Sequence, residues 1–271
     1  MSDGGVRDGG VRDGVVRDGP PTRAEVCAAA IADCFAHDGE ILANPIGTLP
    51  VIGGRLAKAT VAPELVMTDG EALLVENILP VGVENPEKVV AGWNPYRTMF
   101  DAVWSGRRHV MMSGSQIDKF GNQNFAFIGP YSAPRTQLLG MRGAPGNTIN
   151  DKTSYWIPAH TTRTFVPAVD AVSGVGYDRA AELPAGGGRF HDIHRIVTNL
   201  CVLDFATPDH RMHLRSVHPG VAVADVVGAT GFELAIDADT PESRLPTDDE
   251  LMWIRERIDP HGLGEKEVPN P

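Results

Sequence analysis

The sequence has 271 residues, of which 42% are hydrophobic, so it can bury a sizeable core in one large α/β domain or two small ones. Its formal net charge of −11 argues against nucleic acid and membrane surfaces as partners, because both attract clustered Lys and Arg. No stretch reaches the roughly 20 apolar residues of a membrane helix. Three cysteines, Cys27, Cys34 and Cys201, predict buried thiols in the cytoplasm rather than a disulfide framework.

Residues 1–20 are predicted to form a disordered tail, because the repeated unit Gly-Gly-Val-Arg-Asp mixes glycine with charge and offers no face to bury. Residues 21–271 contain no linker and are predicted to form one domain. A capping-box pattern from Thr22 to Glu25 predicts the start of a helix over residues 26–36.

Strand and helix signals alternate through the rest of the chain. Such alternation is typical of a mostly parallel sheet that helices cover on both faces, so an α/β fold is predicted. The predicted elements are strands at 41–43, 65–67, 109–112, 196–205 and 212–217, helices over 51–60 and 97–104 with a glycine C-cap at Gly106, and a closing helix from the capping box Thr247 to Glu250 through Ile258.

A polar loop at residues 113–124 directly follows the predicted strand at 109–112. Open α/β sheets bind ligands at the carboxyl ends of their strands. Gln116 and Asn122 place amide donors and acceptors beside glycines that permit tight turns, and they are candidate substrate-binding residues. A long surface turn is the alternative interpretation of the same residues.

A glycine-rich segment, residues 140–147, could aim backbone amides at an anion. Dinucleotide binding is an alternative that the spacing G-x-x-G-x-x-G disfavours, since Pro145 interrupts it and no clean helix is predicted before Pro158. The pairs His191-x-x-His194 and His210-x-x-His213 lack an H-E-x-x-H context, so no metal site is predicted.

Taken together, several segments resemble the β subunits of class I CoA-transferases, in the branch of glutaconate CoA-transferase. The resemblance implies a three-layer αβα fold with an open, mostly parallel sheet, an acyl-CoA substrate with no separate cofactor, and an α-type partner in an α2β2 heterotetramer whose active site lies between the subunits. The matching segments are 46–50 with 62–63, 113–118 with 120–122, 134–136 with 143–144, and 230–234 with 258–260.

One departure from this family concerns its nucleophile. The family's transferases carry a glutamate that becomes a covalent CoA thioester, and the resemblance places Gly70 at that position. Asp69 and Glu71 lie one residue away on either side, so a CoA-transferase that uses one of them stays an alternative. A transferase must hold CoA covalently between its half-reactions, whereas a hydrolase needs no such acid.

Without the glutamate, this sequence resembles a subgroup of the family. That subgroup comprises the hydrolases of actinobacterial steroid (cholesterol) catabolism, which open the ring of a cyclic β-keto acyl-CoA. This resemblance implies that a carboxylate of the α subunit activates water, and that the backbone N–H groups of Gly143 and Ala144 stabilise an enolate. Arg142 would lie near an anionic group of the substrate, and Asn44 would contact substrate or CoA. A non-catalytic scaffold subunit is a third hypothesis.

Overall fold

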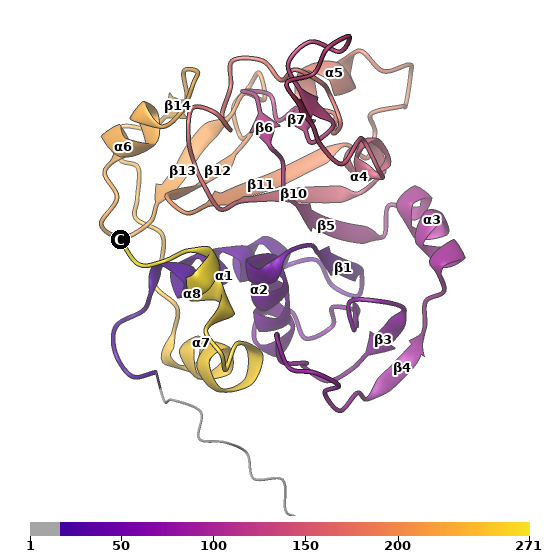
Figure 1. Ribbon diagram of the computed structural model, residues 1–271, viewed down its shortest axis with the longest axis vertical. Coiled ribbons are helices and arrows are strands. Elements are labelled where there is room, and N and C mark those ends of the chain that lie inside the picture. Colours follow the sequence, from indigo (N-terminus) through magenta and orange to yellow (C-terminus); the bar gives the residue numbers. More distant parts are fainter. Residues whose placement is uncertain (1–16) are drawn as a thin grey trace, which may run out of the picture.

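A seven-stranded sheet runs through the computed structural model, which describes residues 17–271 (Figure 1). The first four strands pair in parallel, the next two pair antiparallel, and the last is again parallel to its neighbour. The predicted open, mostly parallel sheet is therefore confirmed. The strand order is β1 (Leu42–Pro45), β5 (Arg108–Met112), β10 (Lys152–Ile157), β11 (Asp192–Thr198), β12 (Cys201–Asp204), β13 (His213–Val217) and β14 (Ala235–Ile236).

Successive residues of the central strands point to opposite faces, as the pleat requires. Met111 and Trp156 pack with the helices α1 (Arg23–Phe35) and α2 (Thr48–Ala59), whereas Met112 and Tyr155 pack in a second core on the other face. Figure 1 shows α1 and α2 on one side of the sheet and shorter helices with small hairpins on the other. The fold thus has three layers.

Close contact between α1 and α2 depends on glycine. A Cβ atom on Gly53 would lie 2.3 Å from Cγ2 of Ile31 and 2.9 Å from the backbone oxygen of Ala28. The predicted capping box at the start of α1 is confirmed, since Thr22 and Glu25 each bond the other's backbone N–H. These two helices fix the position of the residues that follow β1.

Smaller elements complete the fold. The helix predicted over 97–104 is confirmed as α3 (Tyr96–Ser105), and its C-cap, Gly106, has the left-handed φ of 67° that favours glycine. The remaining elements are β2 (Met67–Thr68), β3 (Leu73–Val75), β4 (Val90–Trp93), α3 (Tyr96–Ser105), β6 (Gln116–Ile117), β7 (Gln123–Asn124), β8 (Phe127–Ile128), β9 (Thr136–Gln137), α4 (Ala144–Asn150), α5 (Tyr177–Ala181), α6 (Val223–Gly228), α7 (Asp248–Met252), the π-helix η1 (Trp253–Ile258) and α8 (Leu263–Glu267).

Three sequence-based predictions of local structure were wrong. The run 196–205 is a hairpin rather than one strand, because the Thr198 hydroxyl accepts hydrogen bonds from the backbone of Leu200 and Cys201 and turns the chain. The run 65–67 meets β1 only through one bridge at Val66, and β2 belongs to a separate three-stranded sheet. A helix, α4, does begin within the glycine-rich segment, with Pro145 in its first turn.

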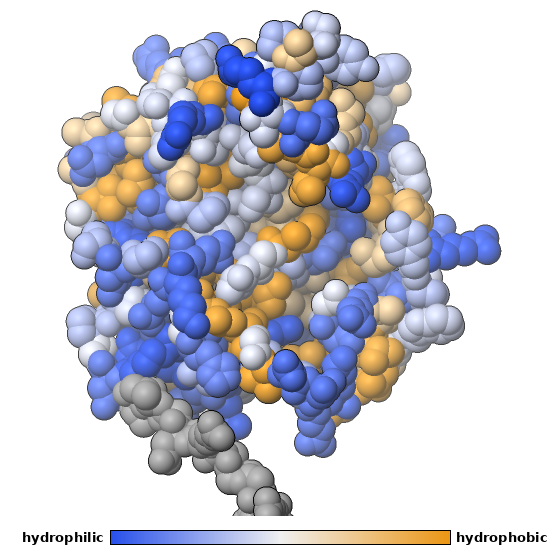
Figure 2. Space-filling view, in the orientation of Figure 1, coloured by the Kyte–Doolittle hydropathy of each residue, from blue (hydrophilic) through white to orange (hydrophobic). Residues whose placement is uncertain are grey.

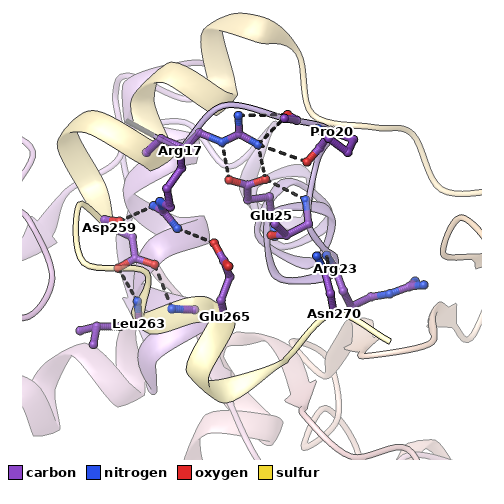
Figure 3. Close-up of polar contacts among 12 residues, drawn as sticks. Arg17, Pro20, Arg23, Glu25, Asp259, Leu263, Glu265 and Asn270 are labelled. Carbon is purple, nitrogen blue, oxygen red and sulfur yellow. Dashed lines mark hydrogen bonds and ion pairs between the residues drawn. The ribbon is translucent and has the colours of Figure 1, made fainter. Parts of the chain in front are cut away.

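The segment before α1 is held against the C-terminal region (Figure 3). Arg17 forms an ion pair of 2.6 Å with Glu265 and donates to the backbone oxygen of Asp259, and Arg255 donates to the backbone oxygen of Gly19. The last four residues of the predicted tail are therefore anchored. The rest of that prediction, for residues 1–16, lies outside the described residues.

The three cysteines are buried and free, which confirms the prediction of buried thiols. Burial raises the pKa of Cys34 and of Cys201 to about 12, so neither thiol ionises near neutral pH. Among residues 17–271, no helix is long and apolar enough to cross a membrane.

Candidate active site

A cavity of about 370 Å³ lies where β1 ends and α2 begins. This is the carboxyl end of a parallel strand, the place where open α/β sheets bind ligands. Its wall is largely aliphatic, with a few polar side chains among the apolar ones. The cavity is lined by Leu42, Ala43, Asn44, Pro45, Ile46, Gly47, Val51, Arg55, Met67, Thr68, Gly70, Glu71 and Met99.

Asn44 is oriented by a buried arginine. Nη1 of Arg108 donates to Oδ1 of Asn44 at 3.2 Å, and Nη2 of Arg108 donates to Asn147 and to Oδ2 of Asp151, the latter at 2.9 Å. The side chains of Arg108 and Asp151 are 4% and 0% exposed. Burial raises the pKa of Asp151 to about 6 even beside this guanidinium. Since an arginine only donates, the amide oxygen of Asn44 faces Arg108.

Arg55 lies on α2 and lines the same cavity. The guanidinium is half-buried, and burial lowers the pKa of this side chain. No side chain or backbone oxygen of residues 17–271 forms a hydrogen bond or ion pair with it. Arg55 was missed at the level of sequence, where it is one polar residue in a predicted helix.

The turn after β2 separates the two candidate acids. Asp69 accepts from the backbone N–H groups of Glu71 and Leu73, and its carboxylate pairs with Lys88 at 2.7 Å. Its side chain is only 2% exposed, and although burial opposes the shift, these partners hold the pKa of Asp69 below its usual value. Glu71 is exposed and lines the cavity.

Gly70 has a φ of 97°, a conformation that L side chains rarely adopt. A glutamate at this position would strain the turn, although a Cβ atom there would meet no other atom within 4 Å. The turn therefore favours glycine at position 70, where the sequence resemblance predicts the nucleophile of a transferase.

Gln116 and Asn122 lie in a buried network on the other side of the sheet and do not line the cavity. Gln116 donates to Asp170 and accepts from Asn124. Asn122 donates to Asp118 and to Asp178, and its oxygen accepts from the backbone of Gly176. Both ends of each amide are thus engaged within the chain, where they hold the 113–124 loop in place.

Arg142, Gly143 and Ala144 lie in the turn that leads into α4. Arg142 is exposed, has a φ of 52°, and donates from Nε to the backbone oxygen of Leu139. The N–H of Ala144 donates to the backbone oxygen of Met141 at 3.2 Å, and Ala144 is 1% exposed. Of the two predicted enolate donors, only Gly143 therefore lies at the surface with its N–H unengaged by residues 17–271.

The structure brings Asn44 and Glu71 to one cavity and adds Arg55, while Asp69 turns its carboxylate to Lys88. A hydrogen-bonded chain from Asn147 of α4 through Arg108 to Asn44 links the Gly143 segment to the cavity wall. Gln116 and Asn122 belong neither to the cavity nor to this hydrogen-bonded chain.

A second arrangement of catalytic residue types lies buried under α1. His109 contacts Asp38 at 2.6 Å and Ser154 at 2.8 Å, in the order of a Ser-His-Asp triad. None of the three side chains is more than 3% exposed, so no substrate reaches the Ser154 hydroxyl. These residues join β5, β10 and the loop that follows α1 rather than perform catalysis.

The histidine pairs serve other contacts. His191 bonds the backbone oxygen of Val175, and His213 lies between Asp204 and Asp237. Within residues 17–271, no group of three or more His, Cys, Asp or Glu side chains has an arrangement that could hold a metal ion.

The sheet and its cavity define an α/β protein with a candidate ligand site at the end of a parallel strand, and the family model for Coenzyme A transferase matches residues 100–229. The "Cholesterol ring-cleaving hydrolase IpdB subunit" of Rhodococcus jostii (strain RHA1) is 52% identical over 248 residues, 91% of this chain and 96% of that protein. The chain therefore belongs to the coenzyme A transferase family.

Two crystal structures agree with this assignment. That of Rhodococcus jostii RHA1 IpdAB matches with a TM-score of 0.86 and 51% identity, covering 92% of this chain and 98% of that one. That of glutaconate coenzyme A-transferase from Acidaminococcus fermentans matches with a TM-score of 0.76 and 25% identity, covering 93% of this chain and 98% of that one. The resemblance to β subunits in the glutaconate branch is confirmed.

Proposed function

We propose that this chain is the β subunit of a heteromeric hydrolase that opens the ring of a cyclic β-keto acyl-CoA in steroid (cholesterol) catabolism. The 52% identity to a cholesterol ring-cleaving hydrolase subunit is the observation that carries the proposal. The buried thiols and the acidic charge support a cytoplasmic location.

The turn after β2 supports hydrolysis rather than transfer. The resemblance aligns Gly70, whose φ of 97° favours glycine, with the transferases' nucleophile, and the carboxylate of Asp69 is engaged with Lys88. Water, activated by a carboxylate of the α subunit, would then attack the ring ketone. Its oxygen bonds to the carbonyl carbon and the bond from that carbon to the α-carbon of the thioester breaks. The electron pair forms a thioester enolate, which takes a proton at carbon, so CoA stays attached.

An unpartnered face beside the cavity fits the α subunit. Helix α3 buries none of its residues in this chain, and its Tyr96, Phe100 and Trp104, spaced by four, are 79%, 55% and 73% exposed. Met99 of the same helix lines the cavity, and Trp93 of β4, three residues before the helix, is 72% exposed. Figure 2 shows apolar surface over the β4 region at the lower right. We call Trp93, Tyr96, Phe100 and Trp104 the aromatic face.

The aromatic face can be tested by co-purification with an α subunit. Trp104→Ser should weaken binding to the α subunit by at least about 1.5 kcal/mol, a loss of tenfold or more in affinity, because exposed aromatic anchors dominate interfaces. Leu245→Ser, at a 52% exposed leucine far along the chain, is the matched control. If the double variant Phe100→Ser/Trp104→Ser still co-purifies fully with the α subunit, the partner binds elsewhere on this chain.

Hydrolysis is tested with the two-subunit enzyme in water labelled with ¹⁸O. One labelled oxygen should appear in the new carboxylate of the product, and no free CoA thiol should be released. Rapid exchange of CoA onto added free carboxylic acids, at a rate close to ring opening, would contradict the hydrolase and identify a transferase.

Exposure of Glu71 at the cavity favours one alternative, a transferase that uses this residue as its nucleophile. A covalent glutamyl-CoA thioester is reduced by borohydride to an alcohol, which mass spectrometry locates. The hydrolase predicts an unmodified peptide over residues 67–73 after incubation with acyl-CoA and borohydride. A reduced residue at Glu71 or Asp69 would instead establish the transferase.

A further inference from the structure

We propose that Arg55 and Asn44 together bind an anionic oxygen of the acyl group in the cavity at the end of β1. That oxygen belongs either to a carboxylate carried by the substrate or to the enolate that ring opening creates. The identity of the acyl-CoA rests on the proposed function, whereas the binding site rests on the residues of the cavity.

The first observation is the charge of Arg55. A half-buried guanidinium has lost part of its hydration, and a counter-charge or several acceptors that replace the lost water stabilise it. Ion pairs satisfy comparable arginines elsewhere in the chain, for example Arg108 with Asp151 and Arg244 with Glu250. Arg55 has no such pair within residues 17–271, and Glu71 across the cavity does not lie within ion-pair distance of it. The cavity thus offers an uncompensated positive charge to a ligand.

The second observation is the direction of the Asn44 amide. Its oxygen accepts from Arg108, so its Nδ2 group, a donor, is left for the cavity that Asn44 lines. Arg108 is fixed in turn by Asp151, and both are buried. Arg108 is therefore a positioning residue that makes Asn44 a donor, and two donors, one charged and one neutral, meet at one cavity.

The cavity wall favours the acyl group over the phosphates of CoA. Ile46, Val51 and Met67 give an aliphatic surface that suits a ring, whereas phosphates require several polar donors. A volume of about 370 Å³ is at the lower end of ligand pockets and is too small for a whole acyl-CoA.

The experiment uses the two-subunit enzyme with Arg55→Met and Arg55→Lys, and takes Arg163→Met, at an exposed arginine, as the matched control. We expect Arg55→Met to lower kcat/KM by at least about 100-fold, Arg55→Lys to recover part of that loss, and Arg163→Met to change nothing. Binding of free CoA, measured by calorimetry, should be equal in all three variants.

The kinetic constants distinguish the two sources of the anionic oxygen. A rise in KM at constant kcat assigns Arg55 to a carboxylate present in the substrate, and a fall in kcat at constant KM assigns it to the enolate. A value of kcat/KM within threefold of the wild type would overturn the proposal and favour a scaffold role for this subunit. Loss of free CoA binding, or dissociation of the two subunits in size-exclusion chromatography, would overturn it too, because Arg55 would then serve a phosphate or the partner.

Asn44→Asp tests the second donor. Aspartate has nearly the same shape and still accepts from Arg108, but it offers no donor to the cavity. We expect at least a 30-fold fall in kcat with an unchanged melting temperature, and full activity of Asn44→Asp would remove Asn44 from the site. The hydrolase proposal fails separately, if the wild-type enzyme takes up no ¹⁸O, and the effects of these variants on acyl-CoA binding are measured whatever that result.

Discussion

Two polar clusters follow two neighbouring strands, and they differ in how many of their hydrogen-bonding groups have partners within the chain. In the 113–124 loop, beyond β5, Gln116 and Asn122 have partners at both ends of their amides. Beyond β1, Asn44 has a partner at its oxygen alone, and Arg55 has none within residues 17–271. The first cluster consumes its hydrogen-bonding capacity in holding a loop, and the second leaves capacity for a ligand.

The difference shows that position at a strand's carboxyl end is not sufficient to make a site. What separates the clusters is whether the chain itself supplies the partners. Substitutions in the first cluster should therefore change stability, whereas substitutions at the cavity should change turnover.

The largest effect on stability is expected for Asn122→Ala. Two carboxylates, Asp118 and Asp178, would lose their shared amide donor, and burial already raises the pKa of Asp118. We expect a loss of about 3 kcal/mol in the free energy of unfolding, measured with urea. Activity per folded molecule should stay within twofold of wild type. A stable but inactive Asn122→Ala variant would show that Asn122 acts in the active site, and the two clusters would then not differ in role.

A smaller effect, and one that depends on pH, is expected for Asp151→Asn. Burial raises the pKa of Asp151 to about 6, whereas an aspartate of the unfolded chain titrates near ~4. The folded state then binds the proton more tightly, so this group's contribution to stability is full at low pH and declines by roughly 2–3 kcal/mol, the equivalent of about two pKa units, as pH rises from ~4 through 6.

Asp151→Asn cannot titrate, so the difference between variant and wild type in unfolding free energy should change with pH across this window and stay constant above about pH 7. Urea unfolding at half-unit steps of pH measures it. A difference that is independent of pH between 4 and 7 would show that Asp151 does not titrate there.

The smallest effects are expected in the turn after β2. Asp69→Asn should cost about 1 kcal/mol, because Lys88 loses its ion pair while the backbone contacts persist. Glu71→Gln should leave stability unchanged and keep kcat within threefold of the wild type, since water is the attacking group. Abolished turnover in Glu71→Gln, with stability intact, would favour the transferase.

Much of the fold could be predicted because local chemistry agreed with the final structure. Each of these motifs depends only on residues close together in the sequence, and each one forms in the structure: the capping boxes at Thr22 and Thr247, and the glycine after α3. The hairpin within 196–205 escaped because its turn is made by one threonine hydroxyl inside an apolar run. The sequence pattern did not predict the helix α4, because Pro145 interrupts the glycine spacing. Proline is nevertheless tolerated in a first helical turn.

The site was less predictable for a different reason. Asp69 and Glu71 are equivalent in the sequence, and only Lys88, nineteen residues away, engages one of them. Arg55 has no distinguishing neighbours, since its significance is an absence of partners that only a folded structure reveals. Asn44 was named through the resemblance to the family, but its orientation depends on Arg108 and Asp151, which local patterns do not connect.

The anchoring of the segment before α1 bears on how the enzyme can be handled. Arg17 pairs with Glu265 and the backbone of Arg23 bonds Asn270, so the start and the finish of the described chain adjoin. Figure 1 places them on the opposite side of the molecule from α3. A purification handle or a fluorescent label attached at the C-terminus would thus leave the aromatic face clear, and a short peptide that joins residue 271 to residue 17 would permit circularly permuted variants.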